Sequence, residues 1–428
     1  MLKQRPLLSL VRLARLGNVG FLSSKFLAAA TRFLDTRKPA QESTVAAIFA
    51  SYFCYVGVFS PYLSLFFSSK GFSVSQIGFL IALTSAVRMF GPLAWAWWSD
   101  RIARPNLLLR LSTGLMLASL LTLPFLSSVS AFAIAIFCLF LANSAVGPIS
   151  EALAIQVSQG DGGRYGRVRL WGSTGFVVGV MALGPLLDLT GVQTLPWWMI
   201  ASGVVVAVIP WFFGDVPAPI KTTQPAARIV SVLQQAPVIL FFISAFFMIF
   251  AHAALYTFYS LQLERLGFSK THIGLFWSIG VLAEIALFYF QDILFKRFSL
   301  LHLLLFSFVC AVIRFVVIGF AEASVVLLIL AQLMHAVTFA VHHSASMGLI
   351  RQWFAPNQLV RAQALYIVIA YGFGGTAGGL LLAQVWERFS SAAVFFASAG
   401  AAALGAVMII LLIKQTSRGA IANQELTN

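Results

Sequence analysis

Long, nearly uninterrupted apolar segments follow one another along most of the sequence, and this feature limits the chain to one class of fold. A helix needs roughly 20 apolar residues to cross a bilayer, and twelve segments approach or exceed that length. They lie near residues 45–67, 74–97, 107–127, 131–157, 166–188, 196–214, 237–263, 270–295, 300–320, 322–350, 358–387 and 391–413. The links between them are too short to hold a separate domain. The sequence therefore predicts an all-α protein of twelve transmembrane helices, with its functional residues inside the bilayer.

Composition excludes the other classes of protein. Only 10% of the residues are charged and 60% are hydrophobic, whereas a soluble domain carries about 25% charged residues. A transmembrane β-barrel would show short alternating segments, and an aromatic content of 14% with few charges is not typical of a disordered chain. The net charge of +15 does not indicate nucleic-acid binding, because the basic residues stand at helix ends and in short loops.

The sequence predicts neither a metal site nor a cofactor site. Cys54, Cys138 and Cys310 lie inside apolar segments, which indicates free cysteines that pack as small hydrophobic residues. His342 and His343 are adjacent, so on a helix their side chains diverge by about 100° and cannot chelate a metal as a pair. A glycine-rich phosphate loop of the Walker type is missing from the sequence, so transport driven by ATP is not expected.

The distribution of basic residues predicts the orientation in the membrane. If the N-terminus is cytoplasmic, 22 of the 28 Lys and Arg residues lie on the cytoplasmic side, four lie outside and two lie within the apolar segments. Short cytoplasmic loops are enriched in Lys and Arg. We therefore expect both termini in the cytoplasm, which requires an even number of spans.

The chain divides into five predicted parts. They are a basic N-terminal extension (1–42), a first six-helix half (43–214), a linker rich in proline (215–236), a second six-helix half (237–413) and a C-terminal tail (414–428). The extension is broken by charges too often to resemble a secretory signal. It could form an amphipathic helix on the cytoplasmic leaflet or an organellar transit peptide. A nonfunctional extension or a misassigned start of translation is the remaining alternative.

An internal repeat relates the two halves. The segment KGFSVSQIGFL, which begins at Lys70, recurs 196 residues later as LGFSKTHIGLF, which begins at Leu266. Both copies follow an odd-numbered span and open an even-numbered one, so the halves have the same topology. Parallel repeats of this kind usually place the substrate site at their interface, near the bilayer midplane.

The six-plus-six plan and the loop SDRIAR between the second and third spans resemble the major facilitator superfamily. The loop pattern of that family, Gly-x-x-x-Asp-Arg-x-Gly-Arg, appears here with alanine in place of both glycines and with Asp100, Arg101 and Arg104 retained. The stretches YFCYVGVFSPYLSLFFSSKGFSVSQIGFLIALTSAVRMFGPLAWAWWSDR and GRYGRVRLWGSTGFVVG are similar to the phenylpropionate permease branch. The resemblance implies a multi-pass, monomeric transporter of the bacterial inner membrane that works by alternating access. It also implies a gating role for the three charged loop residues.

Four ionisable residues stand at membrane depth, where an unpaired charge is costly: Arg88, Glu151, Glu284 and Arg314. Arg88 could hold a substrate carboxylate through paired hydrogen bonds, or form a structural pair with an acidic side chain. Tyr55 and Tyr62 share a stripe on the first span that suits either aromatic contact with a substrate or ordinary helix packing. His252 and Tyr256 on the seventh span could likewise line a cavity or pack.

Glu284 stands 196 residues after Arg88, so the halves carry opposite charges at equivalent positions. A carboxyl group shielded from water holds a proton more readily and releases it when a cation approaches, which is what a proton symporter needs. A static salt bridge to Arg314 is the alternative. Glu284, Arg314 and His335 also resemble the coupling residues of galactoside–proton symporters, although no acid follows His335 on its helix.

Two further groups of polar residues accompany these charges. Gln332, His335, His342 and Ser346 form one stripe on the tenth span, where a histidine could relay protons. Glu151 could form a gating ion pair with Arg164, Arg167 or Arg169, it could bind the transported proton, or it could be no more than a charge at a helix end.

The sequence thus favours a proton-coupled transporter that takes up a small aromatic carboxylate, with lipid, substrate and protons as its only expected partners. A proton symporter of a sugar or nucleoside is the alternative within the same fold. A membrane enzyme is not expected, because the sequence offers no clear pair of nucleophile and base. A transport-inactive sensor or assembly factor is the alternative from another class.

Overall fold

The computed structural model describes residues 37–102, 104–159, 161–212 and 229–425. Within them, twelve helical segments are long and apolar enough to cross a membrane, as the sequence predicts. They are Gln41–Ser69, Val74–Ser99, Pro105–Phe125, Val129–Ser158, Gly162–Thr190, Val192–Phe212, Ala236–Arg265, Lys270–Arg297, Leu300–Phe320, Val325–Trp353, Leu359–Arg388 and Ser391–Ser417. Most of the predicted extension 1–42 and most of the predicted linker 215–236 lie outside the described residues.

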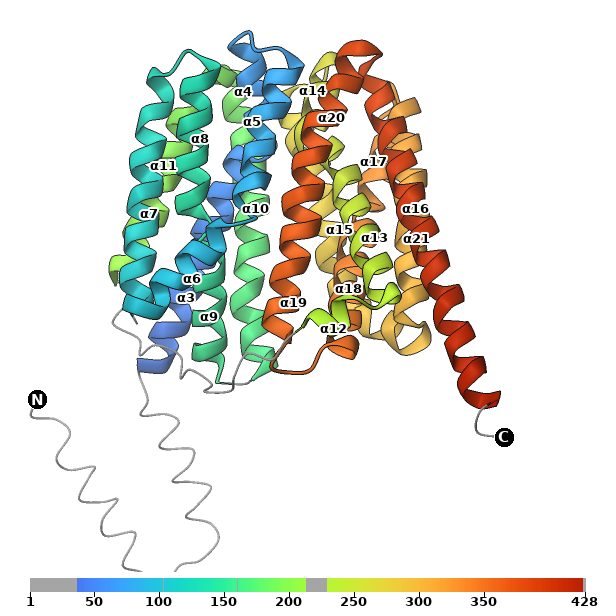
Figure 1. The fold of residues 1–428 in the computed structure, drawn as a ribbon. Helices are drawn as coiled ribbons and strands as arrows, with labels where there is room; N and C mark the ends of the chain where they lie inside the picture. Colours follow the sequence, from blue (N-terminus) through green and yellow to red (C-terminus); the bar gives the residue numbers. More distant parts are fainter. Residues whose placement is uncertain (1–36, 103, 160, 213–228, 426–428) are drawn as a thin grey trace, which may run out of the picture.

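The helices form two groups that stand side by side (Figure 1). The first group contains α3 (Arg37–Phe59), α4 (Leu63–Ser69), α5 (Val74–Val87), α6 (Gly91–Ile102), α7 (Pro105–Thr122), α8 (Val129–Asn143), α9 (Val146–Ser158), α10 (Gly162–Thr190) and α11 (Leu195–Val208). The second contains α12 (Val230–Leu233), α13 (Ala236–Ala253), η4 (Ala254–Tyr259), α14 (Ser260–Arg265), α15 (Lys270–Arg297), α16 (Leu300–Phe320), α17 (Val325–Leu333), η5 (Val337–Val341), α18 (His342–Trp353), α19 (Leu359–Tyr366), η6 (Ile367–Gly374), α20 (Gly375–Arg388) and α21 (Ser391–Glu425). We call these groups the N-half and the C-half.

Helix α3 begins and helix α21 ends at the same end of the bundle (Figure 1), which we call the terminal end. The opposite end, where α4 leads into α5 and α14 leads into α15, is the distal end. The two copies of the sequence repeat lie at the distal end and adopt the same local structure. Gly71 and Gly267 have φ angles of +80° and +86°, a conformation that suits glycine. Two residues later, Ser73 and Ser269 cap the N-termini of α5 and α15 with their side chains.

The halves pack on each other mainly through two pairs of helices, α5 with α20 and α10 with α15. Glycines allow this close approach. A Cβ atom added to Gly78 of α5 would lie 2.6 Å from the Cβ atom of Ala383, and one added to Gly184 of α10 would lie 2.8 Å from the Lys270 carbonyl oxygen. Contacts this short leave no room for a larger side chain, so the halves meet backbone to backbone near the distal end.

Several spans are interrupted near mid-depth. The second span breaks between α5 and α6, where the amides of Arg88 and Met89 bond to carbonyls only three residues earlier, and Pro92 follows without an amide hydrogen. In the C-half, three spans contain a π-helical turn, namely η4, η5 and η6. Such wide turns occur often at functional sites, because they redirect side chains within a continuous helix.

Candidate functional site

Arg88 stands at the break in the second span, and its side chain is exposed although it lies at membrane depth. Its guanidinium carbon lies 5.7 Å from the centroid of the Tyr371 ring, within the range of a cation–π contact. Among the residues whose side chains the structure describes, the guanidinium has no ion-pair partner. Its charge is within electrostatic range of Tyr52 on α3, Tyr256 on η4 and Tyr371 on η6. Arg88 is therefore free to meet an anion.

Glu284 on α15 lies within electrostatic range of two of these three tyrosines. Its side chain is 19% exposed, and its charge acts on Tyr256 and Tyr371, the tyrosines that Arg88 also reaches. The Tyr256 ring in turn lies 6.1 Å from the Trp277 ring. A cation from one half and a carboxyl from the other thus share an aromatic environment, which we call the central site.

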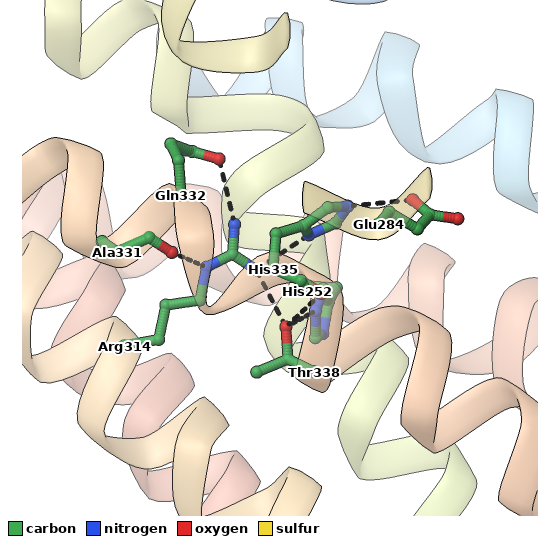
Figure 2. A network of polar contacts seen from close by, with 7 residues as sticks. All are labelled: His252, Glu284, Arg314, Ala331, Gln332, His335 and Thr338. Atoms are coloured by element: carbon green, nitrogen blue, oxygen red, sulfur yellow. Dashed lines mark hydrogen bonds and ion pairs between the residues drawn. The ribbon is translucent and has the colours of Figure 1, made fainter. Parts of the chain in front are cut away.

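Arg314 on α16 is fully buried and belongs to a network of polar contacts in which His335 stands between it and Glu284 (Figure 2). Its Nε donates to the Ala331 carbonyl oxygen at 2.8 Å. Its Nη1 bonds to His335 Nδ1 at 3.0 Å and to Thr338 Oγ1 at 3.1 Å, and its Nη2 donates to Gln332 Oε1 at 3.3 Å. Within the described residues the guanidinium contacts only neutral acceptors, and no carboxylate pairs with it.

His335 stands between Arg314 and Glu284, and the contacts fix its tautomer. A guanidinium has only hydrogens to donate, so His335 Nδ1 must be the unprotonated acceptor. The hydrogen of the neutral ring is then on Nε2, which faces Glu284 Oε2 at 3.8 Å. This distance is too long for a hydrogen bond. A small movement of either side chain would nevertheless connect the carboxyl group to Arg314 through the imidazole.

His252 belongs to this network rather than to the surface of the central site. It is fully buried, its Nδ1 donates to the Met248 carbonyl oxygen at 2.8 Å, and its Nε2 lies 3.2 Å from Thr338 Oγ1. The predicted neighbour Tyr256 is only partly buried and reaches the central site. Thr338 joins Arg314 and His252 into one unit, and its role was not expected from the sequence.

Tyr55 and Tyr62 of the first span are both fully buried. Tyr55 packs with its ring centroid 5.0 Å from that of Phe59. Tyr62 donates its hydroxyl hydrogen to the Val180 carbonyl oxygen at 2.9 Å near the distal end. Both side chains are thus packed between helices in this structure, and their predicted part in substrate binding stays a prediction. Tyr52, on the same helix, is within electrostatic range of Arg88.

Glu151 lies in a separate cluster toward the terminal end. It accepts a hydrogen bond from Arg169 Nε at 2.9 Å and another from the Tyr165 hydroxyl at 2.7 Å. Arg164, a second predicted partner, pairs with Glu42 instead. The Arg169 charge also acts on Glu284.

Among the charged residues between the second and third spans, the structure describes two side-chain contacts, both between Arg101 and Trp97. The Arg101 guanidinium stacks 3.3 Å from the centroid of the Trp97 ring, and its Nη1 donates to the Trp97 carbonyl oxygen at 3.4 Å. Arg104 is exposed directly before α7, and the side chain of Asp100 lies outside the described part. The gating role of these residues thus stays a prediction.

A separate apolar groove of about 1130 Å³ lies between α6, α7 and α8. Trp97, Leu115 and Ile134, which line it, are all strongly exposed. The groove contains none of the four intramembrane charges, and apolar side chains make up most of its lining. The described residues contain no group of three or more potential metal ligands.

A model of the MFS_1 like family matches residues 44–397. The chain belongs to the MFS_1 like family. It is 30% identical to a probable 3-phenylpropionic acid transporter of Escherichia coli, over 79% of this chain and 88% of the relative. It is 24% identical to a maltose permease of Geobacillus stearothermophilus, over 86% of this chain and 93% of the relative.

A solved structure of the nucleoside transporter NupG has the same fold, with a TM-score of 0.77 at 15% identity over 87% of this chain and 99% of that one. The resemblance to the major facilitator superfamily and its phenylpropionate permease branch is therefore confirmed. The chain is a multi-pass membrane transporter and not an enzyme. The identity of the substrate and of the coupling ion depends on the residues of the central site.

Proposed function

We propose that this transporter takes up a small aromatic carboxylate together with protons, across the inner membrane of a bacterium and as a monomer. The observation that carries the proposal is the unpaired Arg88 beside Tyr371, opposite Glu284. An exposed guanidinium at membrane depth is costly unless water or an anion reaches it. A bound carboxylate would neutralise this charge through two parallel hydrogen bonds.

The surroundings of Arg88 suit an aromatic acid. Tyr52, Tyr256 and Tyr371 lie within electrostatic range of the guanidinium, and the Trp277 ring adjoins Tyr256. Aromatic rings pack well on each other in offset or edge-on arrangements. The name of the Escherichia coli relative, a probable 3-phenylpropionic acid transporter, supports the same substrate class.

Glu284 is the proposed proton site. Its carboxyl group is partly buried and lies within electrostatic range of Tyr256 and Tyr371. Because burial disfavours the charged form of a carboxyl group, it can carry a proton while the substrate is bound. Release follows when His335 approaches, because its Nε2–H can donate to the carboxylate and Arg314 holds the ring from the other side. The proton therefore enters and leaves at the Glu284 carboxyl, and the histidine stays neutral throughout.

The orientation is part of the proposal. The terminal end faces the cytoplasm, since both ends of the described chain lie there (Figure 1) and basic residues predominate on that side of the sequence. The halves pack closely at the distal end, which faces the outside in this orientation. We therefore assign the structure to the state that is closed toward the outside.

Uptake of radiolabelled 3-phenylpropionate into proteoliposomes tests the proposal. Arg88→Gln should lower uptake at least 100-fold, and Arg88→Lys should restore little, because an ammonium group lacks the planar fork of a guanidinium. Arg265→Gln is the matched control, since Arg265 also stacks on an aromatic ring, Trp386, but at the distal end. Normal uptake by Arg88→Gln would refute a carboxylate site at this residue.

A neutral ring compound is the second candidate, because Tyr256 and Trp277 could stack a sugar or nucleoside without Arg88. The maltose permease among the relatives is consistent with that alternative. The same assay with maltose and uridine decides between them. If none of the compounds is transported by a folded protein, a transport-inactive sensor or assembly factor becomes the better interpretation.

A further inference from the structure

Two carboxylates at the distal end each bond to the first turn of a helix in the opposite half. Asp188, near the end of α10 in the N-half, accepts hydrogen bonds from the Lys270 and Thr271 amides of α15, at 2.8 and 2.9 Å. It also accepts one from the Thr271 hydroxyl at 2.6 Å. The carboxylate thus occupies the N-terminus of α15, where free amides and the helix dipole favour a negative charge.

Glu387, near the end of α20 in the C-half, makes the equivalent contact with α5. Its Oε1 accepts a hydrogen bond from the Ser75 amide at 2.8 Å, and its Oε2 accepts one from the Ser75 hydroxyl at 2.6 Å. Gln384, one turn earlier on α20, donates to the same hydroxyl oxygen at 2.8 Å. A carboxylate of each half therefore caps a helix of the other half.

The internal repeat relates these two contacts. Ser75 and Thr271 are separated by the repeat distance of 196 residues, and each donates both an amide and a hydroxyl hydrogen to a carboxylate. A glycine stands beside each contact, Gly78 on α5 and Gly184 on α10, and allows the opposite backbone to approach. The same bonding pattern thus occurs twice, although the two halves share little sequence outside the repeat.

We propose that Asp188 and Glu387 are two equivalent latches that hold the distal end closed and set how often it opens. Every bond in the two latches crosses between the halves, so all of them must break when the halves separate at this end. The nearby ion pair between Glu264 Oε1 and Lys270 Nζ, at 3.1 Å, lies within the C-half and would survive the opening. The latches therefore stabilise the closed state and not the fold of either half.

Spin-label distances across the distal end test this proposal. The three native cysteines are replaced by serine, and nitroxides are attached through Ser127→Cys and Ala323→Cys, in exposed loops of the two halves. Double electron–electron resonance then reports the ratio of open to closed molecules in lipid nanodiscs. This readout needs no substrate, so it is independent of the proposed aromatic carboxylate.

Asp188→Asn and Glu387→Gln should each raise the open-to-closed ratio roughly fivefold to tenfold, as expected for lost bonds to a partly solvated charge. Combining them should multiply the effects to about 25- to 100-fold, since the latches share no residue. Glu264→Gln removes a carboxylate beside the same helix N-terminus and should leave the ratio unchanged. If a carboxylate variant fails to accumulate, Thr271→Val removes one cross-half bond and should raise the ratio about twofold. Ser75→Ala removes two, the bond to Glu387 and the bond from Gln384, and should raise the ratio at least as much.

Unchanged distances in both carboxylate variants would overturn the proposal. A shift in only one of them would overturn the pairing of the two latches. An equal shift in Glu264→Gln would show that loss of negative charge at the distal end, and not loss of the cross-half bonds, opens the protein.

Discussion

Thr338→Val offers a direct test of the buried network, because one hydroxyl joins three partners. Thr338 Oγ1 accepts a hydrogen bond from Arg314 Nη1, lies within hydrogen-bond distance of His252 Nε2, and bonds to the His335 carbonyl oxygen. Valine has nearly the same shape, so the substitution removes polar contacts without creating a cavity. The substitution leaves the buried guanidinium of Arg314 and the buried ring of His252 each without one hydrogen-bond partner.

The expected cost follows from these lost bonds. A hydrogen bond to a charged group contributes about 1.5–3 kcal/mol, and an unsatisfied buried histidine nitrogen costs about 1–3 kcal/mol more. Thr338→Val should thus destabilise the protein by about 2.5–6 kcal/mol and lower the unfolding temperature in detergent by about 5 °C or more. Thr338→Ser, which keeps the hydroxyl, should unfold within about 2 °C of the natural protein.

A matched control is Thr113→Val on α7. Thr113 is also fully buried, but its hydroxyl bonds only to carbonyls of its own helix, Leu109 and Arg110. This variant should change the unfolding temperature by about 2 °C at most. If Thr338→Val unfolds at no lower temperature than Thr113→Val, the network around Arg314 does not stabilise the protein through Thr338.

Two further predictions concern topology and packing. A reporter that is active only outside the cytoplasm should be silent when fused after Asn428, and strong activity would reverse the proposed orientation. Gly280→Leu should lower uptake about tenfold at normal expression, because even a Cβ atom there would lie 3.0 Å from Gln332 Oε1; Gly114→Leu, where a Cβ meets nothing within 4 Å, should transport normally.

The spans and the repeat could be predicted from the sequence because the bilayer itself fixes the length of each apolar segment. The repeat also placed Arg88 and Glu284 at equivalent depths, and the structure brings both within reach of Tyr256 and Tyr371. Charged residues are rare inside a membrane, so each one stands out in the sequence.

The sequence could not predict which residues share a face of an interrupted helix, because the periodicity argument assumes the same number of residues in every turn. The turn η5 interrupts the tenth span, and the expected stripe divides there. Gln332 and His335 contact Arg314, whereas His342 packs with its ring 5.4 Å from that of Phe308. Tyr371 lies on η6, and its part in the site had no signal in one sequence beyond its aromatic character.

Tyr62 illustrates a second limit of prediction from sequence, which is that a helix face does not reveal what it packs against. The stripe of residues that contains Tyr62 on the first span is compatible with a cavity and with a helix interface. Only the structure shows that α10 lies against this tyrosine. Asp188 and Glu387 have the same difficulty. Charges near helix ends are common, so their bonds to the opposite half become visible only when the two halves are placed together.

The central claim is that Glu284 carries the transported proton, and counterflow measurements on Glu284→Gln test it most directly. Glutamine mimics a carboxyl that never releases its proton. The variant should fail to accumulate 3-phenylpropionate under a pH gradient yet exchange it across the membrane as fast as the natural protein, because exchange needs no net proton release. Glu151→Gln, which alters a carboxylate paired with Arg169 outside the central site, should still accumulate substrate. Accumulation by Glu284→Gln together with its loss in Glu151→Gln would contradict this assignment and place the proton site on α9.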